Sequence, residues 1–90
     1  MRTIGFTGRF KRDWKREKRT DPKLDQLLLP VIDLLLADAE LPQKLFDHAL
    51  TGGWKGFRDC HIKPDLVLIY EKLERILSLV RLGSHSELFG

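Results

Sequence analysis

The 90-residue chain has the size of a single domain, here taken as residues 1–90, and its 42% hydrophobic content is enough for one modest core. The longest apolar stretch, Leu27–Ala37, is interrupted by Pro30 and Asp33 and is too short to cross a membrane. The charged N-terminus lacks the apolar segment of a secretory signal, and the single cysteine, Cys60, excludes an internal disulfide, so a cytoplasmic location is expected.

The positive charge is concentrated at the N-terminus. Residues 1–19 hold eight Lys or Arg against two acids, a local excess of six in a chain whose net charge is +3. Such a segment attracts phosphate backbones in a salt-dependent way, but a merely solvated helix face would carry the same charges. Charge alone therefore leaves both interpretations open.

The first part of the chain predicts a strand followed by two helices. Residues 2–6 suit a short strand, and residues 8–19 have the pattern of an amphipathic helix, with an aromatic stripe for the core. A second helix is predicted from Pro22 to about Ala39, with Asp21 as its cap and a kink or break at Pro30. The aromatic stripe consists of Phe6, Phe10 and Trp14, and an arginine stripe on another face consists of Arg9, Arg12, Arg16 and Arg19.

The second half predicts an antiparallel sheet. Residues 43–53 have the composition of a short helical turn and a loop. Three segments rich in β-branched, aromatic and leucine residues follow at 54–63, 66–72 and 75–82, separated by turn signals. Leu66–Tyr70 is continuously apolar, as in a central strand covered on both faces. The three strands form a meander, and the predicted fold is α+β, with the helices packed on one small sheet and the C-terminal tail over an edge or end.

All three histidines of the chain lie in its second half among carboxylates. His48 precedes the first meander strand, His61 lies within it, and His85 follows the last strand. Asp59 shares a strand face with His61, because side chains alternate along a strand, and Asp65 lies in the next turn. A single histidine is ordinarily a surface residue, but three among carboxylates indicate a site for proton transfer.

Two other chemistries fit the same region less well. A metal site is disfavoured because Cys60 and His61 point to opposite faces of a strand and no CxxC or HExxH spacing occurs. A nucleophilic role for Cys60 is also disfavoured, because alternation turns its thiol towards the covered face, where cysteine is inert packing.

The C-terminal half resembles a known protein family. The blocks that carry the resemblance are Asp47-His48 with Leu50, GWKGFRDCH at 53–61, Pro64-Asp65, Leu68-Ile69-Tyr70 and RLGSHSELFG at 81–90. In this order and spacing they resemble the YafQ branch of the RelE-like toxins of bacterial toxin–antitoxin systems. Residues 1–45 agree with that family only in layout.

The resemblance implies a RelE-like fold and a small cytoplasmic endoribonuclease that enters the ribosomal A site and cleaves mRNA with no metal or cofactor. It implies a cognate antitoxin, usually encoded beside the toxin, which blocks this access, and contact with operator DNA only through the antitoxin complex. Carried onto matching positions, it nominates His48, Asp59, His61, Asp65, His85 and Phe89 as catalytic residues and Arg81 as a phosphate-facing cation.

These residue types suit RNA cleavage without a metal. The reaction needs a base for the ribose 2′-hydroxyl, an acid for the departing 5′-oxygen and a cation for the charged phosphorane. His85 is expected to be the acid, and His48 or His61 the base or a charged stabiliser. Asp59 or Asp65 is expected to orient an imidazole or to share the role of base.

Further positions are expected to contact RNA. Arg81 is expected to bind the scissile phosphate, Phe89 to stack on a splayed base, and Lys55 to touch the RNA chain. Arg81 has a structural alternative, an ion pair with a neighbouring acid, and Phe89 has one in closing the core. The basic helix is expected to bind ribosomal RNA, so changing Arg12 and Arg16 to Glu is expected to weaken ribosome binding with the fold intact.

The main alternative is a non-catalytic RNA- or protein-binding module, in which the basic helix binds and the histidines are incidental. It predicts salt-sensitive binding without cleavage. A second alternative is an antitoxin complex whose main effect is to repress its own promoter, which is compatible with nuclease activity. The sequence carries no evident DNA-reading motif of its own.

Overall fold

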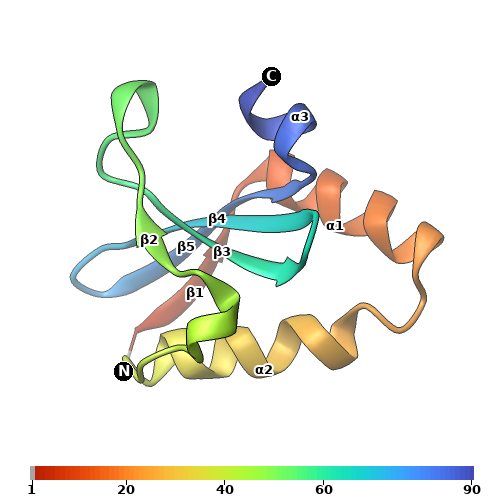
Figure 1. The fold of residues 1–90 in the computed structure, drawn as a ribbon. Helices are drawn as coiled ribbons and strands as arrows, with labels where there is room; N and C mark the ends of the chain where they lie inside the picture. The colour runs from red at the N-terminus through yellow and green to blue at the C-terminus, as the bar shows by residue number, and fades with distance from the viewer. Residues whose placement is uncertain (1) are drawn as a thin grey trace.

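The computed structural model describes residues 2–90, and its centre is a five-stranded sheet of order β1-β5-β4-β3-β2 (Figure 1). The strands are β1 (Thr3–Phe6), β2 (His48–Ala49), β3 (Arg58–Lys63), β4 (Leu66–Lys72) and β5 (Ile76–Gly83). The helices are α1 (Gly8–Thr20), α2 (Asp25–Leu36) and α3 (His85–Phe89), with 3₁₀ turns η1 (Gln43–Leu45) and η2 (Gly52–Trp54). The predicted α+β fold and its meander are confirmed.

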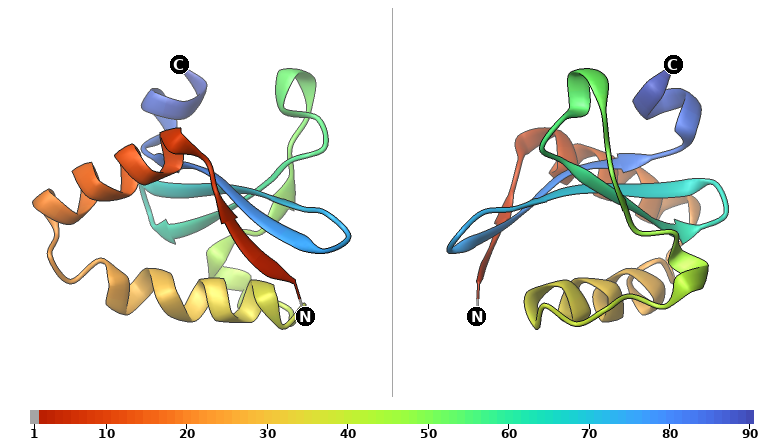
Figure 2. Two further views of the ribbon diagram at one scale, coloured as in Figure 1. Left: turned by 180° about the vertical axis from the view of Figure 1, so that it is seen from behind. Right: turned by 60° about the vertical axis from the view of Figure 1, so that its left-hand side comes forward.

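The chain places its first strand at one edge of the meander. β1 pairs in parallel with β5, as Figure 2 shows from behind, and the other strand pairs are antiparallel. Among the described residues, 2–90, no helix is long and apolar enough to cross a bilayer. α1 and α2 follow β1 directly and pack on the same face of the sheet (Figure 2).

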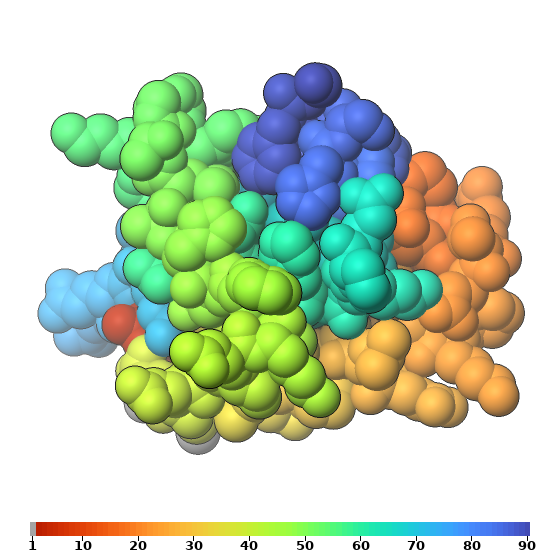
Figure 3. All heavy atoms as spheres, in the orientation of Figure 1, coloured from red at the N-terminus to blue at the C-terminus, as the bar shows by residue number. Residues whose placement is uncertain are grey.

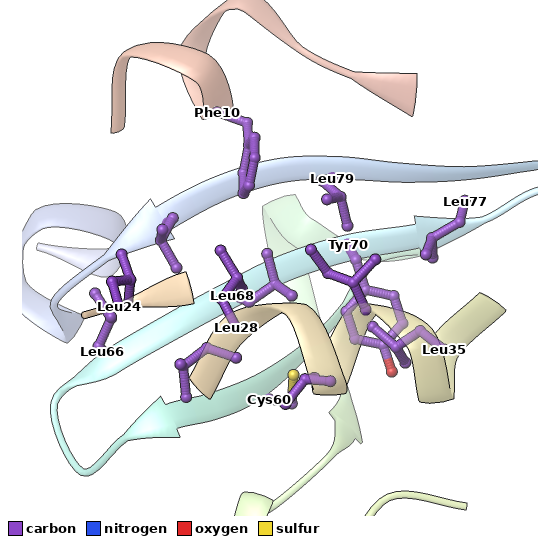
Figure 4. Close-up of a cluster of buried hydrophobic side chains, with 14 residues drawn as sticks. Phe10, Leu24, Leu28, Leu35, Cys60, Leu66, Leu68, Tyr70, Leu77 and Leu79 are labelled. Atoms are coloured by element: carbon purple, nitrogen blue, oxygen red, sulfur yellow. The ribbon is translucent and has the colours of Figure 1, made fainter. Parts of the chain in front are cut away.

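The main core lies between that face and the two helices. Cys60 of β3, Leu68 and Tyr70 of β4, Phe10 of α1 and Leu28 of α2 are all fully buried in one cluster (Figure 4). On the opposite face of the sheet, residues 67 and 69 of β4 form a smaller cluster with the inner side of α3. The prediction that residues 66–70 are covered on both faces is therefore confirmed.

Side chains of α1 continue the edge of the sheet where β1 ends. The hydroxyl of Thr7, the N-cap residue, accepts the Phe10 N–H at 3.0 Å and donates to the Val80 carbonyl at 2.7 Å. Further along the edge, the Leu82 N–H donates to Asp13 Oδ2 at 3.0 Å, and Arg16 Nη2 donates to the Leu82 carbonyl at 3.1 Å. These bonds satisfy the free backbone groups of β5.

The second helix differs from its prediction. It begins at Asp25, because Asp21 ends α1 and its carboxylate accepts the Lys23 N–H at 3.0 Å in an intervening turn. It is also unbroken at Pro30, so of the two expected outcomes, a kink or a break, the break is wrong. Pro30 and Gln26, whose carbonyl loses its intrahelical partner, both lie on the exposed side of the helix, where water can satisfy that carbonyl.

Two other boundaries were predicted incorrectly, and the C-terminal tail has a structure that the sequence left open. The strand expected at 54–63 begins only at Arg58, because Trp54 belongs to η2. The loop expected at 43–53 contains the short strand β2, which pairs with β3. The C-terminal tail forms a helix, α3, whose start is fixed by a capping box between Ser84 and Glu87.

Candidate active site

The nominated histidines and carboxylates gather on the sheet face that α1 and α2 leave uncovered. β2, the end of β3, the turn after it and α3 supply them. Figure 3 shows the corresponding segments meeting on one surface, with residues 40–50 in yellow-green, the β3–β4 turn in teal and the C-terminal helix in blue. Residues far apart in the sequence therefore form one continuous site.

His61 and His85 form the centre of this site. Their ring centroids lie 5.0 Å apart with the rings edge to face. Nδ1 of His85 lies 3.1 Å from Oδ1 of Asp65, and the His85 backbone N–H donates to the same oxygen at 3.3 Å. Because Nδ1 is engaged, Nε2 is the nitrogen of His85 that can exchange a proton with a ligand.

Asp65 is held in its charged form. The hydrogen bonds from the His85 ring and backbone, together with the charges of His85 and His61, lower the pKa of this exposed carboxyl below its usual value. The ionised carboxylate fixes the orientation of the His85 imidazole, as an acid–base pair requires.

His48 and Asp59 form the second part of the site, where β2 pairs with β3. Nδ1 of His48 lies 2.7 Å from the Phe46 carbonyl and 3.0 Å from Asp59 Oδ1. The direction of the ring N–H suits the carbonyl, and Asp59 Oδ1 has no hydrogen-bond donor among residues 2–90. We assign the bond to the carbonyl, because a hydrogen bond needs alignment as well as a short distance.

Asp59 is a buried carboxylate beneath the histidines, with 2% of its surface exposed. Burial raises the pKa of its carboxyl above the usual value, while the charges of His48, His61 and His85 act in the opposite direction. A buried oxygen without a donor is rare in folded proteins, and a perturbed carboxyl in such a setting is typical of functional sites.

Asp47 anchors the segment that carries His48. The hydroxyl of Tyr70 donates to its carboxylate, and the guanidinium of Arg58 lies 3.3 to 3.4 Å from both carboxylate oxygens. Burial raises the pKa of the Tyr70 hydroxyl, so this hydroxyl stays protonated and continues to donate. The strand β2, only two residues long, is thereby fixed to the body of the sheet.

The C-terminal helix presents Phe89 beside the histidines. Leu88 is buried against β4, whereas the Phe89 ring is 40% exposed and lies 6.2 Å from the ring of His85. Trp54 contacts Phe89 edge-on at 6.2 Å and Phe57 at 5.5 Å. Leu88, not Phe89, therefore closes the small core, and the Phe89 ring is open to a ligand.

Arg81 forms an ion pair with an acid, which is the structural alternative considered for it from the sequence. Its Nε lies 2.7 Å from Oδ2 of Asp13, and only 13% of its side chain is exposed. Arg16 is also engaged, with Asp13 Oδ1 at 3.1 Å, Glu17 Oε2 at 3.0 Å and Glu87 Oε2 at 3.2 Å. Arg16 therefore joins α1 to α3, unlike the rest of the arginine stripe.

The remaining candidates make no recorded contact with the histidine rings among residues 2–90. Lys55 is exposed at the end of η2. Cys60 is fully buried in the main core, and burial raises the pKa of its thiol to about 12, which makes it inert. Within residues 2–90, no three or more His, Cys, Asp and Glu side chains are arranged to hold a metal ion. Three arginines of the stripe, Arg9, Arg12 and Arg19, are exposed on α1.

Sequence reasoning missed two residues that the structure brings to attention. Asp13 lies three positions after Phe10, so helical spacing already placed it on the buried side of α1, which is a usable signal for a structural acid. Phe46 lies next to His61, with 5.4 Å between ring centroids, and no local pattern indicated it.

The fold is that of a class of small bacterial toxins. A copper-bound mutant toxin from Helicobacter pylori matches this structure with a TM-score of 0.94 and 42% identity, over 99% of this chain and 100% of that one. YafQ in the Escherichia coli DinJ–YafQ toxin complex matches with a TM-score of 0.90 and 35% identity, over the full length of both chains.

The sequence comparisons agree with the structural ones. The family model described as "Bacterial toxin of type II toxin-antitoxin system, YafQ" matches residues 2–90. The mRNA interferase toxin YafQ of Escherichia coli K12 is 35% identical over 90 residues, which cover 100% of this chain and 98% of that protein. The chain therefore belongs to the YafQ family of toxins of bacterial type II toxin–antitoxin systems, which confirms the resemblance seen in its C-terminal half.

Proposed function

We propose that this toxin is a ribosome-dependent endoribonuclease that cleaves mRNA in the ribosomal A site by acid–base catalysis without a metal. The observation that carries the proposal is the contact between His61 and His85, with Asp65 bonded to the second ring. Two imidazoles side by side supply the acid and the base or stabiliser that the reaction needs. The name of the Escherichia coli relative, an mRNA interferase, supports RNA as the substrate.

His85 acts as the general acid in this proposal. Its Nδ1 is bonded to Asp65, which leaves Nε2 to protonate the 5′-oxygen of the departing nucleotide. This transfer matters because the alkoxide would otherwise leave as a strong base.

The general base comes from the part of the site formed by His48 and Asp59. Nδ1 of His48 donates to the Phe46 carbonyl, so the neutral ring has an unprotonated Nε2 that can accept the proton of the 2′-hydroxyl. Asp59 lies beneath it with a raised pKa, which makes this carboxylate a stronger base than an exposed one. His61, between the two halves, stabilises the charge that develops on the phosphorane.

Arg81 contributes to charge stabilisation from a fixed position. Asp13 engages its Nε and Nη2, and a guanidinium has five N–H donors, so donors remain for a phosphate oxygen. A cation that is already oriented costs little reorganisation when the phosphorane forms. Phe89 stacks on a splayed base beside His85, and Lys55 contacts the RNA backbone.

A metal is not required by this scheme. The related Helicobacter pylori toxin was solved with bound copper, but the ligand-type side chains of residues 2–90 do not form a cluster of three or more that fits a metal ion. The proton-transfer groups already present supply the acid and the base, so no step here is routed through a metal.

The partners of the toxin follow from its charge and its family. The exposed cations Arg9, Arg12 and Arg19 form a basic surface for ribosomal RNA, outside the site itself. DinJ, which forms a complex with the Escherichia coli relative, supports a cognate antitoxin for this chain. Both roles belong in the bacterial cytoplasm, and any operator DNA is contacted through the antitoxin complex.

The test is mRNA cleavage on programmed ribosomes in the presence of EDTA. The natural chain is expected to cleave, and His85→Ala to lose about 100-fold or more in rate, the usual contribution of a general acid. Ser86→Ala, on the same helix, is the matched control and is expected to cleave normally. Rates that recover only when Cu²⁺ or Mg²⁺ is added would contradict the metal-free step.

A non-catalytic binding module is the alternative, and the exposed basic face of α1 is the observation that favours it. It predicts that the natural chain binds ribosomes in a salt-dependent manner and leaves the mRNA intact. The same experiment separates the two functions.

A further inference from the structure

Phe46 is placed in the open by the fold. Its ring is 64% exposed, more than any other large hydrophobic side chain of residues 2–90. Its backbone is left-handed, with φ 50° and ψ 42°, a conformation that suits Gly or Asn and is an outlier for a bulky residue. Such strain persists where the surrounding structure imposes it, and it is concentrated at functional sites.

The left-handed backbone of Phe46 positions its carbonyl to bind His48. Phe46 ends η1, its N–H donates to the Gln43 carbonyl at 3.1 Å, and its own carbonyl accepts the Nδ1 proton of His48 at 2.7 Å. The left-handed turn thus orients a site histidine. Asn or Gly would provide the same backbone at lower cost, so the turn explains the conformation but not the aromatic ring.

The ring belongs to a row of aromatic and imidazole side chains. Phe46 lies 5.4 Å from His61, His61 lies 5.0 Å from His85, and His85 lies 6.2 Å from Phe89. The two histidines therefore lie between two exposed phenylalanine rings, one from η1 and one from α3. Only the ring on α3 has a role in the proposed function above.

A cleft of about 680 Å³ is lined by both Phe46 and His61. α2 supplies apolar side chains such as Leu27 and Leu34 to its wall, and η1 supplies Leu45. Lys44 and Lys63 line the same cleft. An apolar wall with an exposed aromatic ring and lysines is the composition of a surface that binds single-stranded nucleic acid.

We propose that Phe46 is a second base-stacking residue of the site, which binds the nucleobase on the opposite side of the scissile phosphate from Phe89. The proposal rests on the RNA-cleaving function proposed above. Two rings that hold successive bases apart expose the phosphate between them to His61 and His85. A base splayed out of its stack on an aromatic ring is a common arrangement in recognition of single-stranded RNA.

Lys44 complements this arrangement. It lines the cleft and has no carboxylate within salt-bridge distance among the residues described, whereas Lys63 is paired with Asp21 at 2.6 Å. Lys44 therefore neutralises the phosphate on the other side of this base from the scissile one. Its contribution depends on salt, and that of the ring does not.

The first test compares two substitutions of Phe46. Phe46→Asn keeps the left-handed turn and removes the ring, and Phe46→Tyr keeps a ring that can stack. Cleavage on programmed ribosomes is expected to fall on the order of tenfold for the Asn variant and to stay close to normal for the Tyr variant, as base–aromatic stacking predicts. The Asn variant is expected to unfold at the same temperature or a higher one, because backbone strain is relieved.

The second test identifies the contacted base. Codon nucleotides that lack the base are introduced one position at a time into the mRNA. At the position whose base stacks on Phe46, removal of the base is expected to slow cleavage by the natural toxin but not to slow cleavage by Phe46→Asn any further. Phe89→Ala is expected to be insensitive to removal of the base at a different position. A structural role for Phe46 would slow cleavage equally at all positions.

The outcomes separate this inference from the proposed function. Normal cleavage by Phe46→Asn, or an unchanged profile along the codon, overturns the role of Phe46 while the natural toxin still cleaves. Absence of cleavage by the natural toxin overturns the nuclease and this inference together.

Discussion

Asp13 holds Arg81 by an ion pair that crosses from α1 to β5. Oδ2 of Asp13 lies 2.7 Å from Nε of Arg81, and the same oxygen accepts the Leu82 N–H at 3.0 Å. The carboxylate is only 5% exposed, so water screens the pair weakly. One acid of the basic helix thereby fixes both the edge of the sheet and the side chain of Arg81.

Asp13→Asn is expected to lower the free energy of unfolding by about 2 kcal/mol at neutral pH, because one buried charged donor loses its partner. It is also expected to slow mRNA cleavage, because Arg81 is then no longer oriented. Urea denaturation followed by circular dichroism measures the first effect. Asp33→Asn, an exposed acid of α2, is the control and is expected to change neither quantity.

The same substitution has a pH signature. Burial raises the pKa of Asp13, but the hydrogen bonds from Arg81 and Leu82 and the charges of Arg81 and Arg16 outweigh it, and the pKa lies below the usual 3.8. A carboxyl whose pKa is lowered in the folded state stabilises the protein fully at a pH above its unfolded-state pKa. This stabilisation is lost as the pH falls through the folded-state pKa. In Asp13→Asn, the free energy of unfolding is expected to fall less steeply as the pH is lowered into the acid range. An unchanged dependence on pH would contradict the ion pair between Asp13 and Arg81.

Asp59→Asn is expected to have the opposite effect on stability. Burial raises the pKa of this carboxyl, so its ionisation costs the folded state free energy once the pH exceeds the unfolded-state pKa. At pH 8 the variant is expected to gain about 1 kcal/mol of stability. Its cleavage rate is expected to fall by about 100-fold if Asp59 shares the role of base.

Thermal unfolding and single-turnover cleavage measure the two effects on the same preparation of Asp59→Asn. Loss of stability with unchanged cleavage would show that the carboxylate is a structural group. Asp65→Asn is a useful comparison, because Asp65 is exposed and its pKa is lowered, so neutralising it is expected to give no gain in stability.

Charge reversal on α1 is expected to separate RNA binding from folding. Arg12→Glu is expected to weaken ribosome binding, most clearly at low salt, with the fold intact. Arg16→Glu is expected to destabilise the fold, because the new carboxylate would face Asp13, Glu17 and Glu87. The earlier expectation that both arginines can be reversed with the fold intact therefore fails for Arg16.

Sedimentation with ribosomes and thermal unfolding measure these two effects. Arg19→Glu provides a second exposed position on the same helix and is expected to behave like Arg12→Glu. If Arg12→Glu and Arg19→Glu both bind ribosomes at low salt as tightly as the natural chain does, the basic face of α1 has no role in ribosome binding.

Local patterns predicted the elements whose burial is regular. Alternation along β3 predicted that Cys60 is covered and that Asp59 and His61 share the other face, and the structure confirms both. The apolar run 66–70 predicted a central strand, which β4 is. The same patterns failed at β2 and α3, because short elements are stabilised by pairing and capping partners that lie elsewhere in the chain.

The sequence by itself determined the fold class, the family and the residue types of the site, because periodicity and motif spacing are properties of neighbours along the chain. Only the tertiary structure decided which groups meet. Arg81 finds Asp13 across 68 positions, and an exposed Phe46 lies beside His61 through a left-handed turn. Packing brings distant residues to one face, and the donors that a buried carboxylate meets there decide whether its pKa is lowered, as for Asp13, or raised by burial, as for Asp59.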